Sequence, residues 1–102
     1  MEVKIFENDN ILTAQLIGRL DTAVSQEVST SLQPLMEQAD KTLVLDCKEL
    51  SYISSSGLRI FLTLRKAAAA KGGKVIVRDI NTEIRQVFMM TGFLNLFEIQ
   101  ES

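Results

Sequence analysis

Along the chain, apolar residues recur either at every second position, as in a strand, or at spacings of three and four, as in a helix. The strand-like spacing appears first. Residues 3–7 and 11–17 are strand-like runs, and the polar tripeptide Asn-Asp-Asn at 8–10 separates them. Two such runs around a short Asn/Asp turn predict a β-hairpin. Three apolar residues of the second run share one face of the predicted strand: Leu12, Ala14 and Leu16.

A helical period begins after Asp21. Apolar residues then recur at spacings of three and four, and Asp21 or Thr22 can cap the helix that they predict. The apolar positions are Val24, Val28, Leu32, Leu35, Met36 and Ala39. Pro34 falls inside this pattern, where it removes one backbone hydrogen bond and crowds the carbonyl four residues earlier. We therefore expect a kink near residues 30–34, or a helix that restarts there.

The rest of the chain alternates between apolar runs and helical patterns. Two continuous apolar runs are typical of strands buried on both faces: residues 42–46 and 74–78. Two further helices are predicted, each ending at a glycine that suits a left-handed cap: from Leu58 to Gly72 or Gly73, and from Asn81 to Gly92. Residues 96–99 could add a final short strand.

The predicted order of elements is β-β-α-β-α-β-α, with a possible terminal β. Strands that alternate with helices imply right-handed crossovers and parallel pairing, whereas the first hairpin adds an antiparallel pair. We therefore predict an α/β fold in a single domain over residues 1–102. Its sheet should be mixed and mainly parallel, with four to five strands flanked by helices.

Composition supports one domain and excludes several classes of function. Apolar residues make up 46% of the 102 residues, enough for one core without disulfides or metals. The net charge of −2 is spread along the chain, which provides no basic patch for nucleic acid or an anionic membrane. No segment has the pattern of a signal peptide or of a membrane span of about 20 apolar residues. A single cysteine, Cys47, favours a reducing, cytoplasmic setting.

Three consecutive serines, Ser54, Ser55 and Ser56, precede Gly57 between a predicted strand and a predicted helix. In open α/β sheets, ligand and regulatory chemistry tends to lie at the carboxyl end of a strand. The simplest interpretation is a helix N-cap, in which a serine oxygen accepts a hydrogen bond from a free amide of the first turn. A cap accounts for one serine and leaves two unexplained.

A second interpretation is a nucleophilic serine, which needs a base beside its hydroxyl. The chain contains no histidine, the segment lacks the first glycine of a G-x-S-x-G elbow, and no S-x-x-K occurs at this site. Cys47 without histidine makes no zinc site, and Lys-Gly-Gly-Lys at 71–74 lacks the spacing of a phosphate loop. We therefore expect no enzyme activity, no metal and no cofactor.

A third interpretation is a phosphate acceptor. A helix N-terminus carries about half a positive charge and several free amides, so it tolerates a phosphate well. Phosphorylation adds roughly −1.5 to −2 charge and would change the surface at this point without unfolding the domain. The residues alone leave the cap and the acceptor both open.

The segment LVLDCKELSYISSSGLRIFL (43–62) resembles the signature of the STAS domain, specifically of the stand-alone bacterial anti-sigma-factor antagonists. GRLD (18–21) resembles the family's Gly-x-Leu/Ile-Asp before the first helix. VFMMTGFLNLFEI (87–99) resembles its C-terminal helix and the turn that follows. The resemblance covers nearly the whole chain and implies a single STAS-like domain.

What the resemblance implies is a partner switch. In the family, the unphosphorylated antagonist binds an anti-sigma factor that is also a serine kinase, and the sigma factor is thereby released. The kinase phosphorylates one serine of the antagonist, which breaks the complex, and a PP2C-type phosphatase restores the unmodified form. The implied partners of this chain are these two proteins, with no direct nucleic acid contact and no membrane insertion.

By position, the phosphate acceptor that the resemblance implies is Ser55, two residues before Gly57. The best-known family pattern has aspartate immediately before the acceptor, where this chain has Ser54. Ser54 and Ser56 are then expected to shape the loop and cap the helix. Gly57 is expected to let the backbone approach a kinase active site, and Asp21 to belong to the partner surface. The alternative function is a STAS adaptor subunit of an ABC lipid transporter or of another non-sigma signalling complex.

Overall fold

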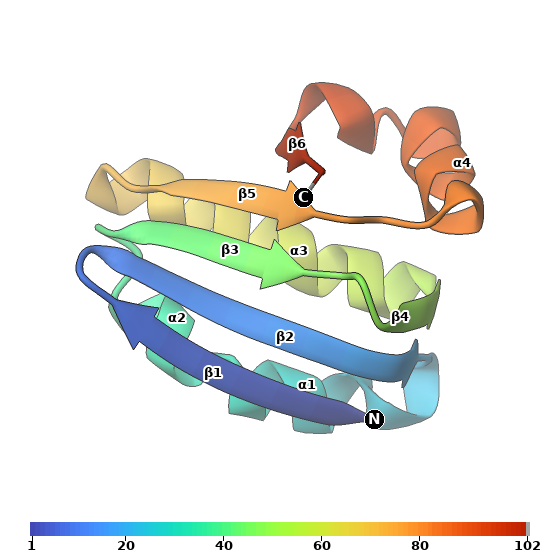
Figure 1. Ribbon diagram of the computed structural model, residues 1–102, viewed down its shortest axis with the longest axis horizontal. Coiled ribbons are helices and arrows are strands. Elements are labelled where there is room, and N and C mark those ends of the chain that lie inside the picture. Colours follow the sequence, from blue (N-terminus) through green and yellow to red (C-terminus); the bar gives the residue numbers. More distant parts are fainter. Residues whose placement is uncertain (102) are drawn as a thin grey trace.

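The computed structural model describes residues 1–101, whose strands form one six-stranded sheet (Figure 1). The strands are β1 (Glu2–Asn8), β2 (Ile11–Leu20), β3 (Thr42–Asp46), β4 (Leu50–Ile53), β5 (Lys74–Arg78) and β6 (Glu98–Gln100). The helices are α1 (Ser25–Ser31), α2 (Gln33–Glu37), α3 (Ser55–Lys71) and α4 (Thr82–Thr91), with short 3₁₀ turns η1 (Thr22–Val24) and η2 (Phe93–Asn95). The predicted α/β fold with a mixed, mainly parallel sheet is confirmed, and the observed order has one strand, β4, more than predicted.

The order of strands across the sheet is β1-β2-β3-β5-β6. β1 and β2 pair antiparallel as the predicted hairpin, and the other neighbours pair in parallel. β4 pairs in parallel with the last residues of β2, beyond the point where β3 ends. β4 is the strand that the sequence analysis missed. Its two central residues, Ser51 and Tyr52, are exposed, so the segment lacks the apolar run by which the other parallel strands were found.

Helices α1, α2 and α3 lie together on one face of the sheet, behind it in Figure 1. The alternating apolar residues of β2 point to this face, and Leu12, Ala14 and Leu16 are all fully buried, as predicted. The central strands β3 and β5 are buried at consecutive positions, which confirms the interpretation of their continuous apolar runs.

The helical pattern around Pro34 is divided into two helices. α1 ends at Ser31, Leu32 leaves the helical conformation, and α2 begins at Gln33 with Pro34 in its first turn. A proline is tolerated there because its missing amide hydrogen would have no partner within the helix. The expected restart is therefore the form that the chain adopts.

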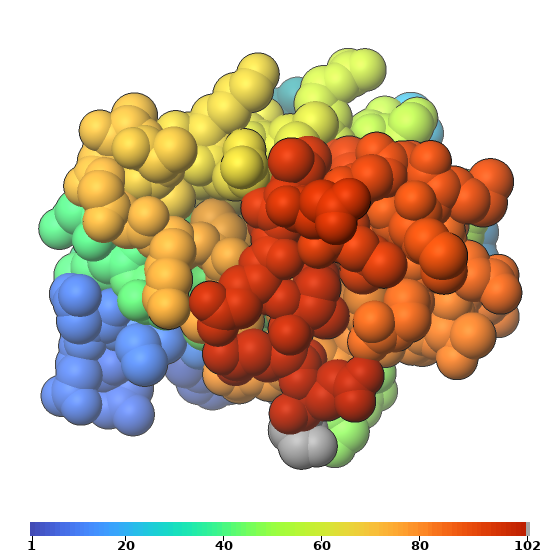
Figure 2. Space-filling model, turned by 90° about the horizontal axis from the view of Figure 1, so that it is seen from above, coloured from blue at the N-terminus to red at the C-terminus, as the bar shows by residue number. Residues whose placement is uncertain are grey.

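Four phenylalanines fix the C-terminal segment against α3. The rings of Phe61, Phe88, Phe93 and Phe97 lie with centroids 5.5 to 6.3 Å apart, mostly edge to face. Figure 2 shows the orange and red C-terminal segment lying beside the yellow part of α3. Arg65 of α3 donates from Nε to the carbonyl oxygen of Leu96 at 2.7 Å. The final strand begins at Glu98, two residues later than predicted, because η2 occupies Phe93–Asn95.

Two neighbouring glycines end α3 for different reasons. Gly72 has φ of +83° and closes the helix in the left-handed conformation, as predicted. Gly73 passes so close to the preceding loop that a Cβ atom would overlap the carbonyl oxygens of Ala39 and Lys41. The first glycine is required by its own backbone angle and the second by its neighbours.

Candidate functional site

The serine segment, residues 54–56, is attached to the carboxyl ends of β2 and β4. The amide of Ser54 donates to the carbonyl oxygen of Leu20 at 2.8 Å, directly after the pairing of Leu20 with Ile53. Ser51 adds a bond from its hydroxyl to the carbonyl oxygen of Gly18 at 3.0 Å. The loop before α3 is therefore held by the sheet.

Ser54 is the N-cap of α3. Its backbone is extended, its Oγ accepts a hydrogen bond from the Gly57 amide at 3.2 Å, and only 8% of the residue is exposed. Its carbonyl oxygen accepts from the Leu58 amide at 2.9 Å. The oxygen of this serine is already engaged in holding the first turn, which agrees with the expected capping role.

Replacing Ser54 by alanine is expected to lower the free energy of unfolding by about 1 kcal/mol, because the Gly57 amide loses its partner. The melting temperature should fall by roughly 4–8 °C, as followed by circular dichroism. Ser55→Ala is the matched control, and its cost should stay within about 0.5 kcal/mol because Ser55 is exposed. Equal costs for the two variants would contradict the assignment of the cap.

Ser55 and Ser56 are the first two residues of α3 and are less enclosed. Ser55 is exposed, and Ser56 is half-buried beside α1. Within residues 1–101, neither hydroxyl takes part in a hydrogen bond. Ser55 is thus the serine of the three that combines an unengaged oxygen with an exposed position.

Gly57 faces the interior of the domain. A Cβ atom on this residue would stand 2.7 Å from Cγ of Leu20 and 2.8 Å from Cγ1 of Ile53. The glycine lets the first turn of α3 pack closely on the ends of β2 and β4. The residue is buried and has this packing role, and the approach to a kinase active site that the resemblance implies stays a prediction.

Asp21 lies at the same end of the sheet as the serines, one residue after the carbonyl that holds Ser54. Its Oδ1 accepts from the Val24 amide at 3.2 Å and caps the short turn η1, which contacts α3. The carboxylate is half-buried and has this structural task; the partner role expected from the resemblance stays a prediction.

Beside the serines is a pair that sequence analysis did not find. The guanidinium carbon of Arg19, on β2, lies 4.4 Å from the centre of the Tyr52 ring, on β4. Both residues are exposed, and a cation over an aromatic face is favourable. No signal in the sequence could have shown this contact, because it depends on the pairing of β4 with the end of β2.

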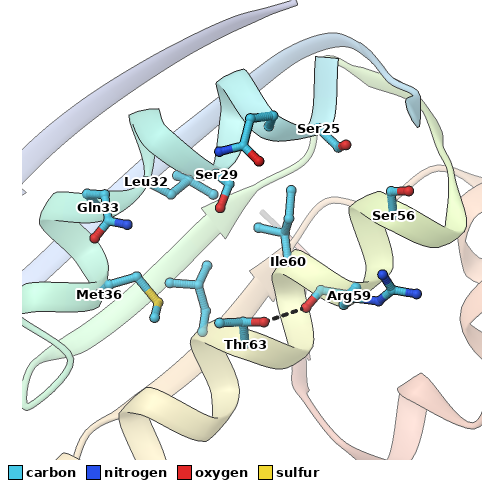
Figure 3. Close-up of a pocket in the computed structure, with 11 residues that line it drawn as sticks. Ser25, Ser29, Leu32, Gln33, Met36, Ser56, Arg59, Ile60 and Thr63 are labelled. Carbon is cyan, nitrogen blue, oxygen red and sulfur yellow. Dashed lines mark hydrogen bonds between the residues drawn. The ribbon is translucent and has the colours of Figure 1, made fainter. Parts of the chain in front are cut away.

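A groove of about 290 Å³ separates α1 and α2 from α3 (Figure 3). Ser25 and Ser29 line its α1 side, and Ser56, Arg59 and Ile60 line its α3 side. Ser56 stands at one end, so the groove begins at the serine segment. The sequence carries no local signal for this groove, because it arises where α1 and α2 pack beside α3, a helix distant from them in the sequence.

Other chemistry is sparse in the described part of the chain. Burial raises the pKa of the Cys47 thiol well above its ordinary value, so the thiol stays protonated. Among residues 1–101, no three metal-ligating side chains come together, and no helix is both long and apolar enough to cross a membrane. The serine segment is therefore the candidate site that the geometry favours.

Comparison with known proteins points to one group. A family model described as the STAS domain matches residues 2–102. BtrV of Bordetella bronchiseptica is 29% identical over all of this chain and 88% of its own length. The anti-sigma-B factor antagonist of Bacillus subtilis is 27% identical, over 97% of this chain and 90% of that protein.

Solved structures have the same fold. A Thermotoga maritima crystal structure matches with a TM-score of 0.90 at 15% identity, covering 98% of this chain and 86% of that one. The Bacillus cell fate determinant SpoIIAA, solved in its phosphorylated form, matches with a TM-score of 0.76 at 18% identity. That match covers 99% of this chain and 91% of SpoIIAA.

Proposed function

Since this chain belongs to the STAS domain family, we propose that it is an anti-sigma-factor antagonist controlled by phosphorylation of a serine. The unmodified chain would bind an anti-sigma factor that is also a serine kinase, and the sigma factor would be released. A PP2C-type phosphatase would later remove the phosphate. The names of the relatives support the antagonist role, since the Bacillus subtilis protein is an anti-sigma-B factor antagonist.

The observation that carries the proposal is the division of tasks among three adjacent serines. Ser54 is buried and its oxygen is engaged in the cap, whereas Ser55 is exposed with a free hydroxyl. A kinase can reach Ser55 without unwinding α3. In that step the Ser55 oxygen would attack the γ-phosphorus of ATP, the hydroxyl proton would be lost, and ADP would leave.

The local electrostatics support a phosphate at Ser55. Ser55 is the first residue of a 17-residue helix, where the macrodipole and the amides of the first turn favour negative charge. The modified chain would therefore stay folded, while its net charge would change from −2 to about −4. Partner release would follow from the new charge at the interface.

Incubation with the serine-kinase anti-sigma factor of the same cell and ATP is expected to add one phosphate, mapped by mass spectrometry to Ser55. Ser55→Ala should remain unmodified, and Ser56→Ala should be modified as the wild type is. Phosphate on Ser56 would move the acceptor by one position. Absence of both binding and modification by every anti-sigma kinase of the cell would contradict the function and favour an adaptor role.

A further inference from the structure

The groove between α1–α2 and α3 continues directly from the proposed acceptor and has a chemistry of its own. Apolar side chains form part of its lining: Leu32, Met36, Ile60 and Leu64. Hydroxyl and amide groups line the rest, from Ser25, Gln26, Ser29, Gln33, Ser56 and Thr63. In Figure 3, Ile60 projects between the helices, and Ser29 faces it from the opposite wall.

Arg59 is the one charged residue among those that line the groove. It lies on α3 close to Ser56 in Figure 3, and its side chain is exposed. None of the ion pairs found within residues 1–101 involves Arg59. The groove therefore presents a depression of mixed apolar and polar lining next to a positive charge that the described chain does not neutralise.

The shape of the groove suits a side chain of another protein better than a free small molecule. Its walls come from two helical segments only, residues 25–36 and 56–64, so one side stays open to solvent. Small-molecule sites usually bury 70–90% or more of a ligand's surface, which two walls cannot do. A depression of this kind can receive the anchor side chain of a protein partner, with polar contacts around that side chain.

We propose that the groove receives an apolar side chain of the anti-sigma factor, and that a carboxylate on the same segment of that partner pairs with Arg59. This inference rests on the proposed function, and it names the part of the surface by which the partner is held. Charge complementarity selects an acidic segment, because an uncompensated cation next to a desolvated contact is unfavourable.

The position of Arg59 also links docking to phosphorylation. Ser55 and Arg59 are four residues apart on α3, so their side chains are neighbours on the helix surface. A phosphate on Ser55 can therefore pair with the Arg59 guanidinium in place of the partner's carboxylate, since charge-assisted bonds between arginine and phosphate are strong. The partner's carboxylate would lose its counter-charge and meet a phosphate in its place.

Isothermal titration of the serine-kinase anti-sigma factor with variants of the full chain tests the groove. Ser29→Trp fills the groove from the α1 side, and Arg59→Glu reverses the charge. Each is expected to weaken binding by about tenfold or more. Thr30→Trp and Lys66→Glu are matched controls on the same two helices, exposed and outside the groove, and should bind within about twofold of the wild type.

A double-mutant cycle tests the competition for Arg59. Ser55→Asp should weaken binding by a clearly smaller factor in an Arg59→Gln background than in the wild type, because the counter-charge is already absent. Equal factors would overturn the competition. Wild-type affinity of both Ser29→Trp and Arg59→Glu, with Ser55→Asp still impaired, would contradict docking of the partner in the groove. The proposed function would then still stand. No binding by the wild type would overturn both.

Discussion

The Ser55→Asp variant is expected to bind the anti-sigma factor about 100-fold more weakly than the wild-type chain, a loss of about 2.8 kcal/mol in binding free energy. Leaving a charge unpaired in a desolvated contact commonly costs about 2–5 kcal/mol, so one carboxylate at this position is sufficient. Ser55→Ala should bind within about threefold of the wild type, because it removes an unengaged hydroxyl and adds no charge. Isothermal titration calorimetry would measure all three affinities.

A matched control for this substitution is Thr82→Asp. Thr82 is the exposed first residue of α4 and follows the cap Asn81, just as Ser55 follows the cap Ser54. An aspartate there makes the same local change at the N-terminus of a different helix, and binding should be unaffected. Equal losses for Ser55→Asp and Thr82→Asp would indicate an effect of net charge. A loss with Ser56→Asp alone would assign the switch to Ser56.

Gly73→Ala is expected to lower the free energy of unfolding by about 3 kcal/mol, at the upper end of the usual cost of overpacking. The new methyl group would overlap the carbonyl oxygens of Ala39 and Lys41, and backbone atoms cannot move aside as a flexible side chain can. The loop that would shift leads into β3, while Gly73 leads into β5, so the change would strain the pairing of these central strands. The melting temperature should fall by roughly 12–24 °C in thermal unfolding followed by circular dichroism.

The preceding glycine provides the control. A Cβ atom at Gly72 meets no atom within 4 Å, so Gly72→Ala carries only the cost of a left-handed backbone for alanine, about 1–2 kcal/mol. The expected order of stability is wild type, then Gly72→Ala, then Gly73→Ala. The reverse order of the two variants would show that the left-handed angle, and not the close approach to the loop, is the dominant constraint at the end of α3.

Apart from β4, the order of strands and helices followed from the sequence because its signals are local. The alternation in β2, the apolar runs of β3 and β5, and the caps at Asn81, Gly72 and Gly92 each depend on a few neighbouring residues. The four residues of β4 carry no such signal. Leu50 and Ile53 at its ends are buried and its middle is exposed, so the segment is a strand because the end of β2 is available for pairing.

In the candidate site, too, some features can be predicted from the sequence and others cannot. A cap among the three serines follows from sequence, because it needs only a short polar side chain before a helix. Which serine keeps a free hydroxyl does not follow from sequence, since the answer depends on the burial of Ser54 against the sheet. The contact of Arg19 with Tyr52 and the groove beside Arg59 depend on tertiary packing, and no pattern of spacing contains them.

The close packing of Gly57 on Leu20 and Ile53 has a consequence for how this segment can evolve. In the tetrapeptide from 54 to 57, the outer two positions are constrained by the fold, one as a cap and the other as a contact without a side chain. The inner two positions are exposed or half-exposed, and the fold leaves them open to change. A descendant that lost its kinase could therefore replace Ser55 and Ser56 freely while retaining the cap and the glycine. Divergence confined to the inner pair would mark the loss of the switch in an otherwise intact domain.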